Sequence, residues 1–411
     1  MRIAMFTDTY LPSRDGVVSS ILLTRKGLEA LGHEVIILAP EPPDRKDRED
    51  GVHYFKSKSF ASYPGYYVPI FPADNCSLLR KLGVDVVHSH GMMFMGLRSM
   101  LAARDLRIPV VVTFHTMVSE AVRYYNFTPI PDRTAEHLLW FYMRELLERA
   151  DAVIAPTNAT KGVLNEFAPG MRRVEVIPTG VDTNRFSPLN DGSAMRRELG
   201  LDEAKVVLTV GRIAWEKNLD LVLRGFRLLH AADKGTKLVI AGKGPAETHI
   251  KGTARDLGID DSTCFPGFVP DVDLPGLYSA CDAFTIASKF ETQGLALLDA
   301  MATGKPVSGI NYRAVGEIID DCVNGFTFYE TPECWAVATA TALNAGPEIG
   351  IRARQKAEEY SVQQCAMRTV ALYEHAIQAK AERLVMEKWP RAYGIRSRTW
   401  KHQQRQRMSF R

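Results

Sequence analysis

The sequence lacks the features that identify several large classes of protein. Its 411 residues contain no apolar run of about 18, the length needed to cross a bilayer. The strand-like start at 1–6 is too short for the apolar core of a signal peptide, so we expect the protein to stay inside the cell. The six cysteines are scattered and form no CxxC pair, which argues against a zinc ribbon or a disulfide framework. We interpret them as reduced thiols.

Two common nucleotide-binding motifs are also missing. The loop after the first predicted strand contains Asp15-Gly16-Val17 instead of the glycine triad of a dinucleotide site, so no nicotinamide cofactor is expected. The later Gly242-Lys243-Gly244-Pro245 is not followed by the Lys-Ser/Thr of a P-loop, and we interpret it as a tight turn. His88 and His90 have the spacing of two metal ligands, but no third ligand lies nearby in sequence, which favours a structural role. We predict no cofactor and no bound metal.

What the sequence does contain is the composition of a soluble globular protein, with 46% hydrophobic and 24% charged residues. Its length exceeds one typical core and predicts two domains. Predicted strands and helices alternate in both halves, which indicates parallel sheets covered by helices. The alternation breaks at 178–188, a turn-rich segment typical of an interdomain linker. We therefore predict an α/β fold of two doubly wound halves.

The most informative segment is 287–306, where two carboxylates stand in an apolar setting. A predicted strand at 283–287 leads through a polar turn into a predicted helix at 295–302, which is apolar except for Asp299. A carboxylate in such a helix needs a partner to offset its desolvation, and sugar hydroxyl groups could supply one. Glu291 precedes the helix, and Gly294 would let a phosphate approach the helix start. From these residues alone, a solvated Glu291 and a structural Asp299 fit equally well.

Two cations and a histidine are predicted to follow strands directly. Arg212 and Lys217 come after the predicted strand 206–210, where they could hold an anion. Loop cations are usually only solvated, so the argument depends on Gly294 falling at the same edge of the same sheet, which favours a diphosphate. In the first half, His115 follows the predicted strand 110–114 and is placed to meet a ligand, although a histidine that merely ends a strand is the default interpretation.

Together these motifs resemble the retaining glycosyltransferases of family 4, which have the two-domain GT-B architecture. The similarity extends to about Ala379 and rests on segments 15–17, 113–116, 178–182, 211–212, 216–218, 242–245, 268–270 and 290–295. The resemblance implies two Rossmann-like domains that face a central cleft. They would be residues 1–186 on the acceptor side and 187–360 on the nucleotide-sugar side, followed by a returning helix at 361–379 and a basic aromatic tail at 380–411.

The resemblance also implies how the donor diphosphate would be bound. Arg212 and Lys217 would hold it by charge. Gly16 and the amides near Gly294 and Leu295 would approach it closely. Such enzymes retain the anomeric configuration and usually need no metal, because fixed cations can stabilise the departing diphosphate.

The rest of the donor would meet four further residues, again by resemblance. Glu291 would face the donor sugar, His115 would approach it from the other domain, and Val269 would contact the base through its backbone. The family's motif is Glu, seven residues, Glu. Asp299 stands here in place of the second Glu, which is expected to bind the nucleotide ribose.

Two features suggest a lipid acceptor. Segment 290–295 resembles the version found in glycosyltransferases that form glycolipids from diacylglycerol. Residues 380–411 hold ten Lys or Arg and two Glu, a net +8 that leaves −5 on the rest of the chain. Such a tail suits an anionic membrane surface, where each cation contributes about 1 kcal/mol, although a merely solvated tail fits nearly as well. We predict a nucleotide diphosphate sugar donor, UDP-hexose in preference to GDP-hexose, and a peripheral position at the inner face of the cell membrane.

Three alternatives stay open at this point. The same transferase could act on a soluble acceptor such as a sugar phosphate, which would leave the tail without a membrane role. The fold could instead support a sugar-nucleotide epimerase or a hydrolase. A nonenzymatic protein that binds nucleic acid through its tail is disfavoured by the −5 charge of the remaining chain, and we predict no specific nucleic-acid partner.

Overall fold

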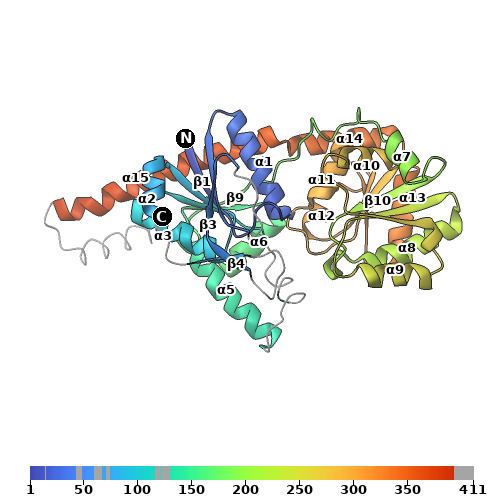
Figure 1. The fold of residues 1–411 in the computed structure, drawn as a ribbon, viewed down its shortest axis with the longest axis horizontal. Coiled ribbons are helices and arrows are strands. Elements are labelled where there is room, and N and C mark those ends of the chain that lie inside the picture. Colours follow the sequence, from blue (N-terminus) through green and yellow to red (C-terminus); the bar gives the residue numbers. More distant parts are fainter. Residues whose placement is uncertain are drawn as a thin grey trace, which may run out of the picture.

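The computed structural model of the chain describes residues 1–13, 15–42, 49–59, 67–70, 75–115, 122 and 130–392. The predicted tail from residue 393 onward lies outside the described residues. Two parallel sheets, each covered by helices, form two domains side by side, and one long helix runs across both (Figure 1). The α/β, doubly wound prediction is therefore confirmed.

The first domain is organised around a seven-stranded sheet in the order β3-β2-β1-β6-β7-β8-β9. Alternate residues of its first strand face opposite ways. Ile3 and Met5 pack with α1 (Gly16–Ala30) and α15 (Val362–Ala392), whereas Ala4 and Phe6 pack with α2 (Asn75–Leu82) and α3 (Phe94–Leu106). A strand buried on both faces reads as an unbroken apolar run, which is why it is recognisable in the sequence. The strands are β1 (Arg2–Phe6), β2 (Glu34–Pro40), β3 (Val52–Phe55), β6 (Val86–Ser89), β7 (Val110–Thr113), β8 (Ala152–Ala155) and β9 (Val174–Val176), with a separate antiparallel pair, β4 (Ser57–Ser59) and β5 (Tyr67–Pro69). The helices are α1 (Gly16–Ala30), α2 (Asn75–Leu82), α3 (Phe94–Leu106), α5 (Asp132–Arg149) and α6 (Asn158–Phe167).

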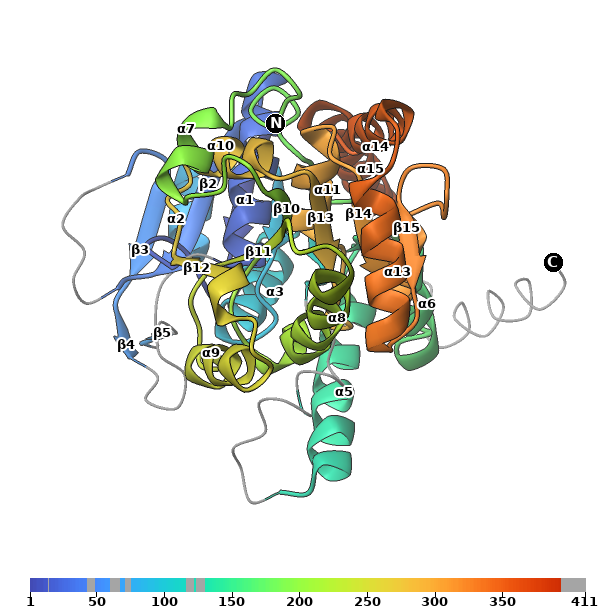
Figure 2. The same ribbon diagram turned by 90° about the vertical axis from the view of Figure 1, so that its right-hand side faces the viewer.

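The second domain is built on a six-stranded parallel sheet in the order β12-β11-β10-β13-β14-β15. Figure 2, in which this domain faces the viewer, shows α8 and α13 side by side over the sheet. The strands are β10 (Lys205–Val210), β11 (Thr236–Ala241), β12 (Thr263–Gly267), β13 (Ala283–Ile286), β14 (Val307–Ile310) and β15 (Phe326–Phe328). The helices are α7 (Ser193–Glu198), α8 (Leu219–Ala232), α9 (Glu247–Asp256), α10 (Leu274–Ala280), α11 (Leu295–Ala302), α12 (Arg313–Ile318), α13 (Pro332–Leu343) and α14 (Pro347–Glu359), with 3-10 turns η1 (Trp215–Lys217) and η2 (Asp260–Ser262).

The strand order reverses at the same place in both sheets. β1 lies between β2 and β6, and β10 lies between β11 and β13. In doubly wound sheets, ligands bind beyond the carboxyl ends of the strands at such a reversal, where neighbouring loops diverge. The loops after β1, β6, β10 and β13 are therefore where the fold itself predicts a site.

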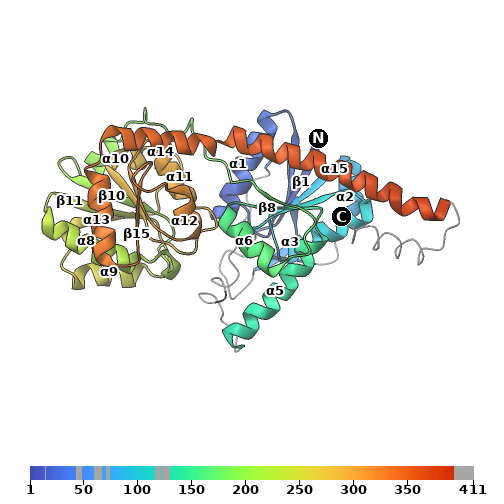
Figure 3. The same cartoon turned by 180° about the vertical axis from the view of Figure 1, so that it is seen from behind.

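The long helix α15 (Val362–Ala392) carries the chain back from the second domain to the first (Figure 3). It begins beside the interdomain linker, where Val181 donates its amide to Tyr360 O at 2.7 Å and accepts from Val362 N at 3.1 Å. Further along, Leu372 and Tyr373 are buried in the core of the first domain. The helix therefore belongs to the first domain by packing, although it follows the second in sequence.

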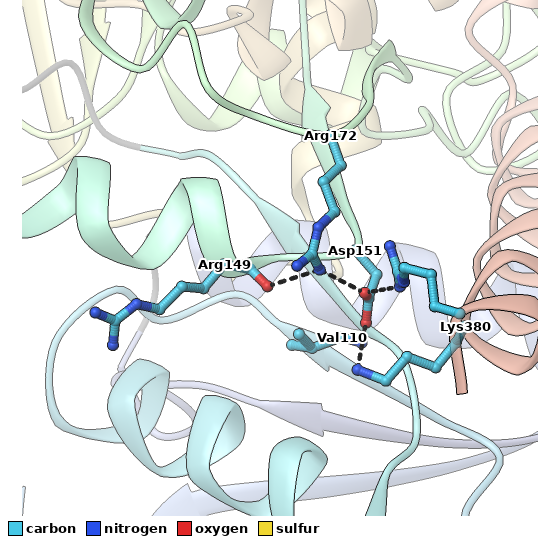
Figure 4. Close-up of polar contacts among 6 residues, drawn as sticks. Val110, Arg149, Asp151, Arg172 and Lys380 are labelled. Carbon is cyan, nitrogen blue, oxygen red and sulfur yellow. Dashed lines mark hydrogen bonds and ion pairs between the residues drawn. The ribbon is translucent and has the colours of Figure 1, made fainter. Parts of the chain in front are cut away.

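The helix also continues past Ala379, where the sequence predicted the tail to begin. Its first turn beyond that point contacts Asp151, whose buried side chain is 1% exposed and accepts from Val110 N at 2.9 Å, Arg172 Nη1 at 2.9 Å and Lys380 Nζ at 3.3 Å (Figure 4). Arg383 of α15 pairs with the same carboxylate. Two cations assigned to the tail are thus structural contacts, and the prediction of a tail from residue 380 is wrong for 380–392.

Within the residues described, no helix has the length and apolar character needed to span a bilayer. None of the six cysteines forms a disulfide bond.

Candidate active site

A cavity of about 1020 Å³ lies between the two domains, at the strand ends where both sheets reverse. It is lined by the loops after β1, β6, β10 and β13. Eight of the nine residues predicted from the sequence line this cavity: Gly16, His115, Arg212, Lys217, Glu291, Gly294, Leu295 and Asp299. Residues from two halves of the chain therefore converge on one space.

Val269 is the predicted residue that does not line the cavity. It follows β12 in a loop and packs, half-buried, against the apolar core of the second domain. Its neighbour in sequence, Asp271, does reach the cavity wall. The loop is thus near the site, but the base contact expected at Val269 has no counterpart in the cavity lining.

The wall formed by the second domain carries two ion pairs. Lys217 Nζ lies 2.6 Å from Glu291 Oε1, and both side chains are mostly buried. Arg212 Nη2 lies 2.6 Å from Oε1 of Glu216, whose side chain is 3% exposed. η1 positions two of these residues, Glu216 and Lys217, because it turns the chain soon after β10. The two predicted cations are therefore held in place by carboxylates, one of which, Glu291, is itself a predicted site residue.

The start of α11 faces the same cavity. Gly294 adopts φ +94° and ψ 62°, a left-handed conformation that favours glycine, and lets the chain turn into the helix at Leu295. The first amides of any helix have no intrahelical acceptor, and the dipole favours an anion beside them. The predicted helix at 295–302 is confirmed at both ends.

Asp299 lies one turn into α11, and its carboxylate faces the cavity. Burial raises the pKa of this carboxyl to about 7, while Arg185 lowers it and Asp182 raises it further. No hydrogen bond from any residue in the described ranges reaches the carboxylate. The partner that the sequence requires for this group is thus not supplied by the described protein.

On the wall formed by the first domain, α1 begins at Gly16. No atom lies within 4 Å of the position that a Cβ on Gly16 would take, so packing within the described residues does not require a glycine there. The carboxylate of Asp15 accepts from the amides of Val17 and Val18, both at 2.9 Å. An anion at this helix start would have to compete with Asp15.

A group of three histidines lies at the ends of β6 and β7: His88 is in β6, His90 follows it, and His115 follows β7. His115 Nε2 is 3.0 Å from His90 Nδ1. His88 Nε2 is 2.7 Å from Thr113 Oγ1, and its Nδ1 is 2.6 Å from the Tyr373 hydroxyl on α15. Burial lowers the pKa of His88 to about 3 and that of His115 to about 4, and lowers the pKa of His90 well below its usual range. The three rings are therefore neutral at physiological pH.

Both nitrogens of His88 are thus taken by protein partners, so a metal could bind there only by breaking one of these hydrogen bonds. Among the residues that the structure describes, no three His, Cys, Asp or Glu side chains are grouped as metal ligands.

Sequence reasoning missed two cavity residues because their partners are distant in the chain. Asp8, after β1, is buried and accepts from the amides of Met93 at 2.9 Å and Met95 at 2.8 Å, so it fixes the start of α3. Gln293 bonds both backbone groups of Thr179 in the linker, through its Oε1 at 2.7 Å and its Nε2 at 2.8 Å. The loop before α11 is therefore tied directly to the interdomain linker.

The two domains also meet at one side of the cavity. Thr157 Oγ1 donates to Thr292 O at 3.1 Å, and Glu317 of α12 accepts from the amides of Asn158 and Ala159 at the start of α6. A negative side chain at a helix start is favourable, so Glu317 helps to hold the domains in this arrangement.

Two Rossmann-like domains with a ligand-sized cavity between their strand ends define the GT-B fold. Two family models match the chain, "Glycosyltransferase Family 4" over residues 14–185 and "Glycosyl transferases group 1" over residues 192–361. The chain is also 30% identical over 392 residues to the alpha-monoglucosyldiacylglycerol synthase of Streptococcus pneumoniae, covering 92% of this chain and 86% of that protein. The chain therefore belongs to glycosyltransferase family 4, as its motifs predicted.

Two further comparisons define how far the similarity reaches. A GDP-mannose-dependent alpha-mannosyltransferase of Mycobacterium tuberculosis is 30% identical over 313 residues, which cover 75% of this chain and 78% of that protein. The crystal structure of Anabaena HepE in complex with UDP and glucose superposes with a TM-score of 0.72 at 18% identity, covering 91% of this chain and 99% of that one. At that identity the structural match supports the GT-B fold alone.

Proposed function

We propose that the protein transfers a hexose from a nucleotide diphosphate sugar to a lipid acceptor such as diacylglycerol, with retention of the anomeric configuration. The observation that carries the proposal is the convergence of Arg212, Lys217 and the start of α11 on one cavity that also holds Glu291. Two cations and a helix start suit a diphosphate, and a carboxylate beside them suits a sugar.

In this reaction the diphosphate would compete with Glu291 for Lys217. Once Lys217 turns to the phosphate oxygens, the Glu291 carboxylate is released to accept hydrogen bonds from the donor sugar. Charge that develops on the leaving diphosphate is then stabilised by fixed cations, so the proposal requires no metal. His115 would contact the same sugar from the first domain, and Gly16 would approach the phosphates.

The nucleotide would extend toward Asp299. Its carboxylate has no hydrogen bond within the described part of the chain, and a ribose offers two hydroxyl donors. We favour a UDP-hexose because the relative named as a glucosyldiacylglycerol synthase aligns over nearly the whole chain and a GT-B neighbour binds UDP and glucose. A GDP-hexose is the second candidate, since GDP-mannose-dependent relatives are also similar.

A lipid acceptor is supported by the apolar residues on the first domain's side of the cavity. Met92, Met93, Leu139 and Met143 line it. Met93 directly precedes α3, and Leu139 and Met143 lie on α5. Both helices also expose apolar side chains outward: Leu97 and Leu101 on α3 are 41% and 42% exposed, and Phe141 on α5 is 64% exposed. α5 projects from the body of the first domain (Figures 1 and 2). A bilayer could therefore deliver its lipid directly to the cavity, and we propose a peripheral position on the inner face of the cell membrane.

Donor-dependent turnover tests the proposal. The protein is incubated with a panel of UDP- and GDP-hexoses, with and without diacylglycerol in anionic vesicles, and free nucleotide diphosphate is followed. We expect release that requires one donor and the lipid, persists in the presence of a chelator, and gives a product with the donor's anomeric configuration by NMR. Release without lipid would indicate a soluble acceptor or hydrolysis, and no release with any donor would overturn the proposal.

Vesicle flotation tests the apolar exterior separately. The double substitution L97Q/L101Q should reduce binding to anionic vesicles several-fold, because it removes apolar area that would enter the bilayer. V337Q is the matched control, since Val337 is 68% exposed on α13 of the second domain. Equal loss of binding in both variants would contradict a role for α3.

A further inference from the structure

His90 lines the cavity beside His115, but the proposed reaction gives it no role. It lies one residue past β6, is buried, and contributes to the cavity lining. Its ring is nearly parallel to that of His115, with an interplanar angle of 18°, and the two centroids are 5.2 Å apart. With Nδ1 of His90 only 3.0 Å from Nε2 of His115, the rings meet nitrogen to nitrogen.

Such a contact requires one proton between the two nitrogens. Both rings are neutral, because burial lowers both pKa values and the His115 ring further disfavours a charge on His90. A neutral imidazole carries its proton on one nitrogen only. Either His90 donates from Nδ1 to His115, or His115 donates from Nε2 to His90.

The other nitrogen of His90 distinguishes these two arrangements. Nε2 of His90 is buried and has no hydrogen-bond partner among the described residues. If His115 were the donor, that nitrogen would carry a buried N–H without an acceptor. If His90 is the donor, only a lone pair is left without a partner. Buried N–H groups without acceptors are the rarer defect in proteins. Donation from Nδ1 of His90 to Nε2 of His115 is therefore favoured.

We propose that His90 is a positioning residue that fixes His115 in its Nδ1–H tautomer, so that His115 donates a hydrogen bond into the cavity. The His115 ring is partly exposed, lines the cavity, and has its Nε2 occupied by His90. Its remaining nitrogen is then a donor and suits an oxygen of the donor sugar. That last step rests on the proposed function, whereas the tautomer itself does not.

His88 is a histidine of the same cluster that has no such positioning role. Both of its nitrogens have protein partners, Thr113 and Tyr373, so its tautomer affects no group in the cavity. Tyr373 therefore supplies a control in the same buried cluster: it bonds His88, whose ring lies against that of His90 but is not hydrogen-bonded to it.

The tautomer can be measured without any substrate. Protein labelled with ¹⁵N-histidine is examined by long-range ¹H–¹⁵N NMR, and the His115 ring is assigned by its loss in H115Q. We expect the protonated nitrogen of His115 to be Nδ1 in the wild type and in Y373F. A protonated Nε2 on His115 in the wild type would overturn the proposal, even if no His90 variant folds.

Variants then test whether the tautomer matters for turnover. H90F keeps a ring but removes the donor, and should release His115 from the Nδ1–H form and lower kcat by about 10- to 100-fold, the cost known for groups that orient metal-bound histidines. H90N keeps an N–H close to the position of Nδ1 and should recover most of the rate, while Y373F should stay near wild type. An H90F enzyme with an unchanged His115 spectrum would refute the assignment. If the wild type turns over no donor, the proposed function fails, but the NMR result still decides the tautomer.

Discussion

The two walls of the cavity are built from opposite kinds of chemistry. The first domain lines it with two neutral histidines, His90 and His115, which burial keeps unprotonated. The second domain contributes cations paired with carboxylates, Lys217 with Glu291 and Arg212 with Glu216. Desolvation by itself removes charge from an isolated group, whereas a close partner allows it to persist. One wall is therefore suited to hydrogen bonding with a neutral ligand, and the other to binding charge.

Asp299 is the exception on the charged wall. It has no paired cation within hydrogen-bonding distance among the described residues, and burial raises the pKa of its carboxyl to about 7. Burial lowers the pKa of the histidines and raises that of Asp299, so both kinds of group favour their neutral forms. Acidification should therefore change the free energy of unfolding in opposite directions through the two walls.

The largest effect should come from removing charge from the second wall. K217M should lower kcat/KM by on the order of 10²–10³-fold, because a fixed cation at a leaving diphosphate acts mainly in the transition state. K289M is the matched control, since Lys289 pairs with Glu330 at 2.8 Å and does not line the cavity. Initial rates with the preferred donor measure both. Similar losses in the two variants would show that the charge of Lys217 has no special role.

A smaller effect is expected on stability when the first wall is acidified. Unfolded histidines take up protons near pH 6.5, whereas the folded cluster resists protonation until about pH 4 or below. The unfolded chain therefore binds more protons between these values, and the free energy of unfolding should fall as pH drops from 7 to 5. Denaturation midpoints at pH 7, 6 and 5 measure this. H115Q removes one of the three groups and should make the fall shallower, and an unchanged slope would contradict the assignment.

The smallest effect concerns the opposing contribution of Asp299. The folded carboxyl binds a proton up to about pH 7 and the unfolded one only up to about 3.8, so this group's stabilisation is greatest at low pH and is lost as pH rises through 7. D299N removes the contribution and should make the acid-induced fall between pH 7 and 5 steeper than in the wild type. The same midpoint series checks it, and a shallower fall would refute the raised pKa.

Local patterns in the sequence were sufficient for much of this site. The apolar run with one carboxylate predicted α11 from Leu295 to Ala302, and the residues after β10 were correctly expected to share an edge with it. These inferences need only helix and strand periodicity and the rule that parallel strands end on the same side.

The rest depended on contacts that no local pattern encodes. The role proposed for His90 depends on its contact with His115, which follows the neighbouring strand. The role of Asp8 depends on amides 85 and 87 residues away. The end of α15 was misjudged because Lys380 and Arg383 look like tail cations until Asp151 is placed beside them. Charge in a sequence does not reveal whether its partner is water or a buried carboxylate.

The course of α15 limits how such chains can be recombined. A hybrid of two relatives joined once, within the linker, would pair one parent's first domain with the other parent's final helix. The helix packs Leu372 and Tyr373 into that domain and bonds Asp151 through Lys380. In such a hybrid, side chains from two different parents would therefore have to pack against each other in a buried interface. An exchange of the sugar-nucleotide half therefore needs two junctions, the second just before Val362, so that the first domain keeps its own helix.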